Sequence, residues 1–344
     1  MRQRSVLTSA ALSIPAAAYG AAMRARNLWY DRPGTSERAP VPVVSVGNLA
    51  VGGTGKTPLV AWLARRARAL GVTPAVVSRG YGSTAGSGPL LVSTGEGPRV
   101  NARACGDEPH LLARSLPGTI VVVGSNRLEG ARAAAGAGAS LVILDDGFQH
   151  RRLARDLDIV VLDGRAPFDN EHVLPWGSLR EPPSSLRRAH VVVLTRLRQA
   201  ETGSAAIHAV METGFAGPVV RAGHRSTGIR DVKGTEVPAP SRALAFCGIG
   251  DPGLFRRDLE AAGVVTTRFH AFRDHYPYSI ADWDRLVAEA RAVGVPLVTT
   301  DKDLSRLSAS VGASLPAAPL LVLRIETVVW DEAPLLAALR KVIT

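Results

Sequence analysis

The amino-acid sequence predicts an α/β fold, in which a parallel sheet is covered by helices on both faces and a smaller C-terminal α/β unit follows. Two observations predict this fold. Short runs that are apolar throughout alternate with helix-like stretches along most of the chain, which is typical of parallel strands buried on both faces. In addition, the chain has 344 residues, more than one ordinary domain usually needs, and 46% of them are hydrophobic.

The N-terminal residues form a segment of their own. Two arginines precede an uncharged, alanine-rich run over residues 5–23, which Arg24 and Arg26 close. The run is about long enough to span a bilayer, since roughly 20 apolar residues are needed, but it is weakly hydrophobic and contains Pro15. A cleaved signal peptide and a helix of a soluble protein are alternatives. The flanking arginines, with Trp29 and its neighbour, favour a helix that docks on a membrane surface with anionic lipids.

The elements of the core follow in order. A linker over 31–42, with three prolines, leads to a β-branched strand at 43–46. The stretch 58–70 alternates apolar and arginine residues at helical spacing, and Gly71 ends that helix. Further strand-like runs lie at 75–78, 120–123, 141–144, 159–162 and 191–195, and helix-like stretches lie at 108–115 and 127–137.

The segment 214–240 is rich in glycine, proline and charge and is the candidate domain boundary. Beyond it, strand-like runs at 243–247, 266–269, 295–299 and 320–325 alternate with helix-like stretches at 252–262 and 279–292. We therefore predict three parts, namely an N-terminal membrane-associated helix (1–30), a nucleotide-binding core (31–225) and a smaller C-terminal α/β domain (226–344).

The formal net charge of +11 comes almost entirely from arginine, since the chain has only four lysines, of which Lys56 is one. A basic surface suits nucleic acid, acidic lipid headgroups or phosphorylated substrates, although a merely solvated surface has the same composition. Cys105 and Cys247 are too few and too far apart in the sequence for a disulfide framework or a metal site, and we expect reduced thiols.

The strongest local motif is G-N-L-A-V-G-G-T-G-K-T-P over residues 47–58, between a predicted strand and a predicted helix. Glycines let backbone N–H groups approach phosphate oxygens, and the helix N-terminus favours an anion. Lys56 would reach the β- and γ-phosphates, and the Thr57 hydroxyl would hold Mg²⁺. The usual pattern has glycine at position 50, where this chain has Ala50, so a chance glycine turn is the alternative. We predict a P-loop NTPase-type fold that binds ATP and Mg²⁺ through Gly52, Gly53, Thr54, Gly55, Lys56 and Thr57.

Two acidic residues follow the strand at 141–144. Asp145 and Asp146 stand where a carboxylate binds Mg²⁺ directly or through water in such enzymes. One would hold the metal while the other orients a neighbouring group. We assign Asp145 to the metal and Asp146 to catalysis, although the pattern alone permits the reverse. A helix N-cap is the structural alternative.

Several motifs occur together in a fixed order: V-G-N-L-A-V-G-G-T-G-K-T-P (46–58), S-R-G-Y-G (78–82), G-D-E-P (106–109), D-D-G-F-Q-H (145–150), L-P-W-G-S-L-R-E-P (174–182), F-C-G-I-G (246–250), F-R-D-H-Y-P-Y (272–278) and T-D-K-D (300–303). With this set, nearly the whole chain resembles the tetraacyldisaccharide 4′-kinases of Gram-negative bacteria, a family that does not require glycine at position 50. The resemblance implies that ATP donates its γ-phosphoryl group to the 4′-hydroxyl of an acylated glucosamine disaccharide 1-phosphate, giving lipid IVA in lipid A biosynthesis. It also implies a place at the cytoplasmic face of the inner membrane.

The resemblance assigns roles to residues that are otherwise ambiguous. Asp107 matches the family's proposed catalytic aspartate and would accept the proton of the acceptor hydroxyl; by itself it looks like a helix N-cap. His275 matches the histidine of F-x-D-H and would reach from the second unit toward Asp107 or Asp146; by itself it could be a packed surface residue. The catalytic site should then lie between the two units, so that their closure brings its halves together.

Weaker assignments complete the predicted site. Arg79 and Arg180 are candidate phosphate contacts, and Glu181 would bind metal or order a loop. Gln149 and His150 would orient the acidic pair. A purely structural role is an equal alternative for all of these residues. Asp301 and Asp303 resemble a nucleotide-contact loop or, equally, a helix cap.

Two other functions remain alternatives at this stage. A soluble P-loop ATPase or GTPase acting as a switch or chaperone would not need the N-terminal apolar run, and the N-K-x-D motif expected for guanine recognition does not occur. A nucleic-acid-binding ATPase is suggested only by charge, because clusters of basic and aromatic residues are lacking. We therefore expect no nucleic-acid partner.

Overall fold

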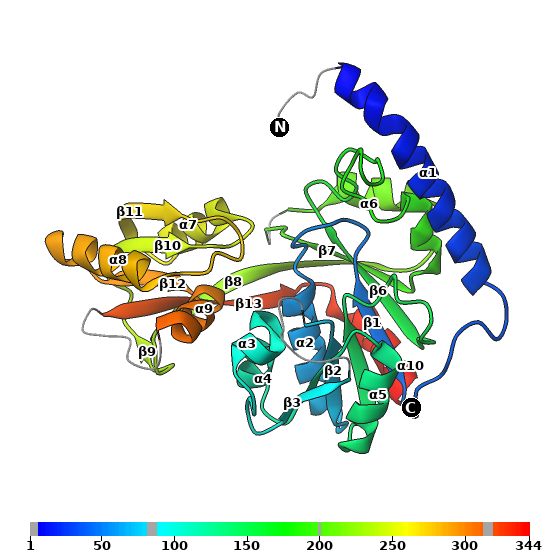
Figure 1. Cartoon of the computed structure of the whole chain (residues 1–344), viewed down its shortest axis with the longest axis horizontal. Coiled ribbons are helices and arrows are strands. Elements are labelled where there is room, and N and C mark those ends of the chain that lie inside the picture. Colours follow the sequence, from blue (N-terminus) through cyan, green and yellow to red (C-terminus); the bar gives the residue numbers. More distant parts are fainter. Residues whose placement is uncertain (1–5, 81–87, 199–200, 312–318) are drawn as a thin grey trace.

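A computed structural model describes residues 6–80, 88–198, 201–311 and 319–344. All thirteen of its strands join one sheet, in the order β11-β10-β12-β13-β8-β7-β6-β1-β5-β2-β4-β3, with β9 paired to β8 (Figure 1). The first unit contains β1 (Val43–Gly47), β2 (Pro74–Ser78), β3 (Leu90–Thr94), β4 (Ile120–Val123), β5 (Leu141–Asp145), β6 (Leu157–Asp163) and β7 (Val191–Thr195). Neighbours in this part pair in parallel except β3 with β4, which confirms the predicted α/β class.

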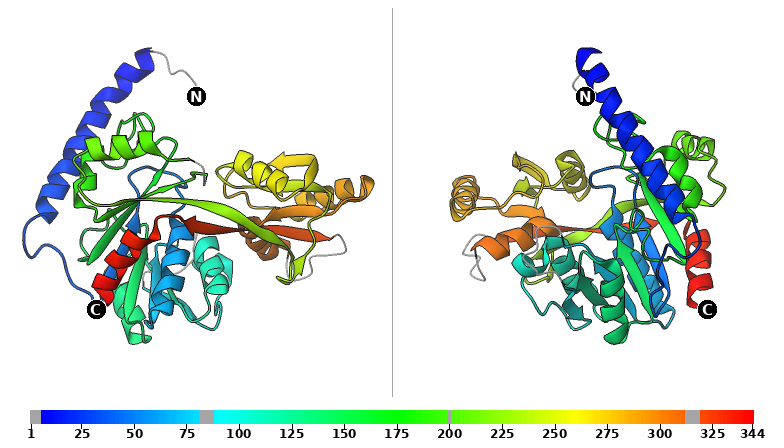
Figure 2. Two further views of the ribbon diagram at one scale, coloured as in Figure 1. Left: turned by 180° about the vertical axis from the view of Figure 1, so that it is seen from behind. Right: turned by 45° about the vertical axis from the view of Figure 1, so that its right-hand side comes forward.

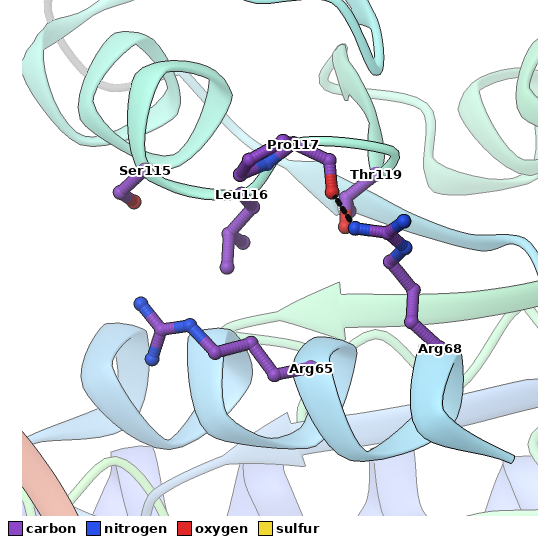
Figure 3. Close-up of a pocket in the computed structure, with 6 residues that line it drawn as sticks. All are labelled: Arg65, Arg68, Ser115, Leu116, Pro117 and Thr119. Carbon is purple, nitrogen blue, oxygen red and sulfur yellow. Dashed lines mark hydrogen bonds between the residues drawn. The ribbon is translucent and has the colours of Figure 1, made fainter.

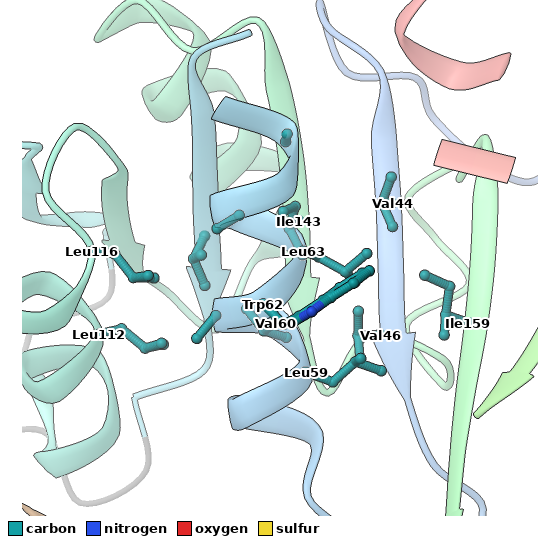
Figure 4. Close-up of a cluster of buried hydrophobic side chains, with 14 of the residues drawn as sticks. Val44, Val46, Leu59, Val60, Trp62, Leu63, Leu112, Leu116, Ile143 and Ile159 are labelled. Atoms are coloured by element: carbon teal, nitrogen blue, oxygen red, sulfur yellow. The ribbon is translucent and has the colours of Figure 1, made fainter. Parts of the chain in front are cut away.

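Helices cover both faces of the first unit. Its helices are α2 (Lys56–Ala69), α3 (Ala102–Cys105), α4 (Asp107–Ser115), α5 (Arg127–Gly136), the 3₁₀ helix η1 (Pro183–Arg188) and α6 (Ser204–Glu212). On one face, apolar side chains of α2 and α4 pack on alternate residues of the central strands, with Leu59 and Leu63 against Val44 and Val46 (Figure 4). Residues of α5 and of η1 with α6 cover the other face in two separate clusters. This layering follows from strands that are buried on both sides.

The second unit is smaller and repeats the same principle. Its elements are β8 (Val219–Asp231), β9 (Glu236–Val237), β10 (Arg242–Cys247), α7 (Pro252–Ala261), β11 (Val265–Ala271), α8 (Ile280–Ala292), β12 (Leu297–Thr300), α9 (Asp301–Val311), β13 (Leu320–Val329) and α10 (Glu332–Ile343). Helices α8 and α9 cover one face of its strands and α7 covers the other.

A two-stranded ribbon connects the units. β8 pairs in parallel with β7 at its start and in antiparallel register with β13 along the rest of its length, so the sheet continues from one unit into the other (Figures 1 and 2). The segment 214–240, expected to be an irregular boundary, therefore contains a thirteen-residue strand. Buried and exposed residues do not alternate regularly along this strand, because its two ends lie in different surroundings. The sequence pattern therefore did not predict it. The division into domains at 31–225 and 226–344 stays a prediction. The C-terminal helix α10 packs back on the first unit, where Leu335 and Leu339 are buried.

The N-terminal helix α1 (Val6–Tyr30) lies along one side of the first unit, and its N-terminal end projects beyond the neighbouring elements (Figures 1 and 2). Pro15 lies inside it. Among the described residues, no helix combines the length and the apolar character needed to cross a bilayer. The predicted helix is thus present, and its association with a membrane stays a prediction.

Candidate active site

The glycine-rich loop joins β1 to α2 in a conformation suited to an anion. Gly52 and Gly55 have positive φ angles of 115° and 84°, which glycine adopts without strain, and Gly55 is the N-cap of α2. Lys56 and Thr57 form the first turn of the helix, where backbone N–H groups lack partners within the helix. The loop therefore places a lysine, a hydroxyl and a helix N-terminus together, as predicted for phosphate binding.

Neighbouring segments hold the loop in place. Ala50 forms an antiparallel bridge with Leu179, and the N–H of Val51 donates to the carbonyl of Ser178 at 2.8 Å. Position 50 is thus paired strand-like backbone, which explains why alanine replaces the usual glycine there. The hydroxyl of Thr195 donates to the carbonyl of Thr54 at 2.7 Å.

Three oxygen-bearing side chains converge beside the loop. The hydroxyl oxygen of Thr57 lies 3.3 Å from Oδ2 of Asp145 and 3.4 Å from Oε2 of Glu108. Burial raises the pKa of Asp145 to about 6, and the charge of Glu108 adds to this effect. Two carboxylates and a hydroxyl provide the kind of oxygen ligands that Mg²⁺ prefers. Among the described residues, no group of three or more acidic, histidine or cysteine side chains is arranged to hold a metal ion, and phosphate and water would supply the other ligands.

Asp146 has the opposite electrostatic environment. Its carboxylate lies 3.3 Å from Nζ of Lys56 and 2.8 Å from Nη1 of Arg180. Burial alone would raise the pKa of Asp146, but these two cations together hold it below its usual value. Asp146 also has a φ of 59°, which is uncommon for a residue other than glycine and typical of functional positions.

The second unit contributes charged groups from α9, which packs against α3 and α4. Nζ of Lys302 lies 2.6 Å from Oε1 of Glu108, and Nε of Arg306 lies 2.9 Å from Oδ2 of Asp107. Burial raises the pKa of Glu108, but the charge of Lys302 and its hydrogen bond outweigh this and leave it lowered. Nδ1 of His275 lies 3.1 Å from Nη2 of Arg306. These contacts join residues of both units, and His275 is linked to Asp107 through Arg306. That the catalytic site lies between the units stays a prediction.

Comparison with known proteins identifies the family. The model of tetraacyldisaccharide-1-P 4′-kinase matches residues 8–344. The chain belongs to this kinase family. Similar proteins include the tetraacyldisaccharide 4′-kinases of Chlorobaculum parvum, 42% identical over 86% of this chain and 83% of the relative, and of Chlorobium limicola, 40% identical over 96% and 97%. LpxK from Aquifex aeolicus, in a crystal structure described as an "apo" form in complex with ATP, is 30% identical with a TM-score of 0.79, over 98% of this chain and 100% of that one.

Other residues that the kinase motifs singled out lie in a second network, next to α1. Glu181 is fully buried and accepts hydrogen bonds from Asn27 of α1 at 2.7 Å, from Gln149 at 3.1 Å and from Arg188 at 3.2 Å. These contacts favour loop ordering over metal binding for Glu181. Gln149 also donates to the carbonyl of Asn48 at 2.9 Å, so it supports the phosphate loop rather than the acidic pair.

The network also reaches the carbonyl of Arg180, which accepts from the hydroxyl of Tyr19 on α1 at 3.0 Å. Arg180 itself pairs with Asp146, so its phosphate contact stays a prediction. Burial lowers the pKa of His150 to about 4, and the charges of Arg127 and Arg155 contribute, with a smaller effect from Arg79. A half-buried His150 with this pKa is neutral near pH 7, and its role in orienting the acidic pair stays a prediction. Tyr81 and Gly82, in the motif of Arg79, lie outside the described residues.

Asp303, in the motif T-D-K-D, has a structural role. Asp303 is fully buried and accepts from the hydroxyls of Thr300 at 2.6 Å and Tyr278 at 3.0 Å, while its N–H donates to Thr300 at 3.2 Å. This is the helix-cap alternative. Pattern analysis missed Glu108, Lys302 and Arg306 as members of the site. The signal for Glu108 was its position beside Asp107 in G-D-E-P, and the signal for Lys302 was the centre of T-D-K-D.

A surface depression lies away from the candidate site. It is lined by Arg65 and Arg68 in the last turns of α2, and by Ser115, Leu116, Pro117 and Thr119 at and beyond the end of α4 (Figure 3). Arg68 donates there to the carbonyl of Pro117. The depression includes neither the phosphate loop nor a carboxylate, and we assign it no ligand.

Proposed function

We propose that this chain is a tetraacyldisaccharide 4′-kinase, which transfers the γ-phosphoryl group of ATP to the 4′-hydroxyl of a tetraacyldisaccharide 1-phosphate and so forms lipid IVA. One observation carries this proposal. Asp107 lies directly beside the Thr57, Glu108 and Asp145 cluster, yet its own carboxylate is outside that cluster. A separate carboxylate at a phosphate loop is what a kinase needs in order to accept a proton from a hydroxyl acceptor.

The described residues divide the work of such a transfer. Lys56 and Arg180 would supply positive charge for the phosphates, and both lie beside the carboxylate of Asp146. Thr57, Asp145 and Glu108 would hold Mg²⁺, which when bound offsets negative charge on the phosphates. Asp107 accepts the proton of the 4′-hydroxyl as its oxygen attacks the γ-phosphorus, and ADP leaves with the electrons of the broken bond.

The acceptor would lie beside α1. Small residues of α1, among them Ala16, Ala17 and Gly20, form one wall of a groove whose other wall includes His172 and Trp176. The rings of His172 and Trp176 are stacked at 3.6 Å between centroids. An aromatic surface beside an apolar helix suits a sugar that carries acyl chains. Tyr19 of the same helix donates to the carbonyl of Arg180, and the side chain of Arg180 contacts Asp146, which supports an acceptor position near the phosphate loop.

We also propose that α1 docks on the cytoplasmic face of the inner membrane, at a surface with anionic lipids. Ile14, Leu28 and Trp29 are 77%, 68% and 57% exposed, which is costly for large apolar side chains in water. Ile14 and Leu28 are separated by close to four helical turns and therefore lie on one side of α1. Arg24, between them, is exposed and could meet acidic headgroups.

One assay tests the activity. Purified full-length protein receives γ-labelled ATP, Mg²⁺ and tetraacyldisaccharide 1-phosphate in detergent, and the label is followed into lipid and into free phosphate. We expect labelled lipid, with a rate that falls by at least about 10²-fold in Asp107→Asn because proton transfer is lost. Label released only as free phosphate would refute the kinase and support the ATPase alternative.

A second assay tests the docking. Flotation with vesicles of neutral and anionic phospholipids should show less binding for Leu28→Glu than for wild type. Val265→Glu is the matched control, because Val265 is 63% exposed on the second unit. Equal binding of Leu28→Glu and wild type would count against docking through α1.

A further inference from the structure

Arg306 makes one of the ion pairs between the two units, with Asp107 of the first unit. It lies on α9 with only 5% of its side chain exposed. Its Nε donates to Asp107 at 2.9 Å, Nη1 to the carbonyl of Gly248 at 2.6 Å and to Asp303 at 3.3 Å, and Nη2 faces Nδ1 of His275 at 3.1 Å. All three guanidinium nitrogens are therefore used, and they join a residue of the first unit to a residue of the second.

The guanidinium is fixed from the side away from the site. Asp303 is fully buried, and it is itself held by the N–H of Gly248 and the hydroxyl of Tyr278, each at 3.0 Å. The charge of a buried arginine needs one carboxylate, and Asp303 supplies it. Pairing with Asp107 and His275, whose side chains are 31% and 60% exposed, is therefore not required to bury Arg306. The planar fork instead orients these two exposed groups relative to each other.

The contact with His275 also decides where its proton lies. A guanidinium group only donates hydrogen bonds, so Nδ1 of His275 must be the acceptor in this contact. A neutral imidazole that accepts at Nδ1 carries its proton on Nε2. Backbone geometry supports a fixed ring position, because His275 has a φ of 57° and its N–H donates to the carbonyl of Gly248 at 3.1 Å.

We propose that Arg306 is a positioning residue for phosphoryl transfer, which holds the carboxylate of Asp107 and the imidazole of His275 in one arrangement and keeps the proton of His275 on Nε2. This inference rests on the proposed kinase activity. Asp107 then uses Oδ2 for Arg306, while Oδ1 has no hydrogen-bond partner among the described residues and stays available to the acceptor hydroxyl. Nε2 of His275 lies 3.9 Å from Oδ1 of Asp274, beyond hydrogen-bond distance, so its N–H can donate to a phosphate or hydroxyl oxygen.

The kinetic test compares Arg306→Gln, Arg306→Lys and wild type in the lipid-labelling assay. In Arg306→Gln, kcat should fall on the order of 10²-fold, because misplaced catalytic groups lose that much, while KM for ATP and lipid changes little. The kcat of Arg306→Lys should lie between those of Arg306→Gln and wild type, since one ammonium group cannot reach both Asp107 and His275. Guanidinium ion added to Arg306→Ala should restore part of kcat, and urea should not.

Arg221→Gln is the matched control. Arg221 forms a two-point pair with Asp331, at 2.7 Å and 3.1 Å, where the second unit returns to the first, outside the site. This variant loses a bidentate ion pair of a more exposed arginine, 28% against 5% for Arg306, and should keep its kcat. An equal loss of kcat in Arg221→Gln and Arg306→Gln would overturn the positioning role in favour of general stabilisation.

The second readout is independent of activity. Nitrogen NMR of wild type labelled at histidine, assigned with His275→Gln, should show Nδ1 of His275 unprotonated and Nε2 protonated. A protonated Nδ1 would overturn the inference even if Arg306→Gln failed to fold. If wild type transfers no phosphate to lipid, the kinase proposal fails while this spectrum still tests the arrangement. Normal kcat in a folded Arg306→Gln would reject the inference and leave the kinase intact.

Discussion

The charge of Asp145 should destabilise the protein when no metal or nucleotide is bound, and Asp145→Asn tests this directly. The side chain is almost completely buried, and burial with the nearby charge of Glu108 raises its pKa from 3.8 to about 6. Between these two values the folded protein keeps a proton that the unfolded chain has released. The free energy of unfolding therefore decreases as the pH rises through this window, and it levels off above pH 6.

The size of the effect follows from the shift. A difference of about two pKa units, at 1.36 kcal/mol each, means that ionised Asp145 costs about 3 kcal/mol. Asparagine has the same shape without the charge, although it weakens the contact with Thr57. We expect Asp145→Asn to raise the free energy of unfolding by about 1–3 kcal/mol at pH 7.5, and to have little effect near pH 4.

Urea denaturation in the presence of a chelator, at several pH values, measures this difference. Asp146→Asn is the matched control, since the neighbouring carboxylate has its pKa lowered by Lys56 and Arg180 despite its burial. That group contributes stability above pH 3.8 which is lost as the pH falls through its folded-state pKa. Asp146→Asn should thus destabilise at pH 7.5. The reasoning would be refuted if the free energy of unfolding of Asp145→Asn were no higher than that of wild type at pH 7.5. It would also be refuted if the increase were the same at pH 4 and at pH 7.5.

Three further changes have expected outcomes. Glu108→Gln should raise the Mg²⁺ concentration for half-maximal activity by about 10-fold or more, because one charged oxygen beside Thr57 is lost, and an unchanged Mg²⁺ titration would contradict it. Gly47→Ala should lower the unfolding free energy by about 1–3 kcal/mol in urea, since the added Cβ would lie 2.4 Å from Cβ of Phe148; a wild-type midpoint would be inconsistent with this packing. Asn27→Ala should cost about 1–3 kcal/mol because buried Glu181 loses a donor, and thermal unfolding equal to wild type would argue against that contact.

Local signals in the sequence were sufficient for the phosphate site. A buried strand, glycines with positive φ and a helix that starts at Lys56 are neighbours in the chain, so their pattern is readable without knowledge of the fold. Asp145 could be placed because parallel strands β1 and β5 are adjacent and end at the same edge. The long strand β8 could not be predicted, since its hydrophobic pattern depends on two different sets of neighbours.

Contacts between distant segments could not be derived from patterns either. Lys302 lies 194 residues from Glu108 in the sequence, and Arg306 lies 199 residues from Asp107. Nothing about a basic residue on a C-terminal helix indicates which carboxylate it will meet. Their partners follow only from the packing of α9 on α4. The motif T-D-K-D marked the right region, but its aspartates proved less informative than its lysine.

The connection between the units gives these contacts a physical consequence. β8 leaves the first unit and β13 returns to it, and the contacts of α9 and an ion pair of Arg165 with Asp251 also join the second unit to the first. Lys302 and Arg306, both on α9, pair with adjacent carboxylates on α4. A movement that separates α9 from α4 would therefore stretch both ion pairs together. The position of the second unit and the charge balance around Asp107 and Glu108 are therefore coupled, and a phosphate or metal ion that competes for these charges would act on both.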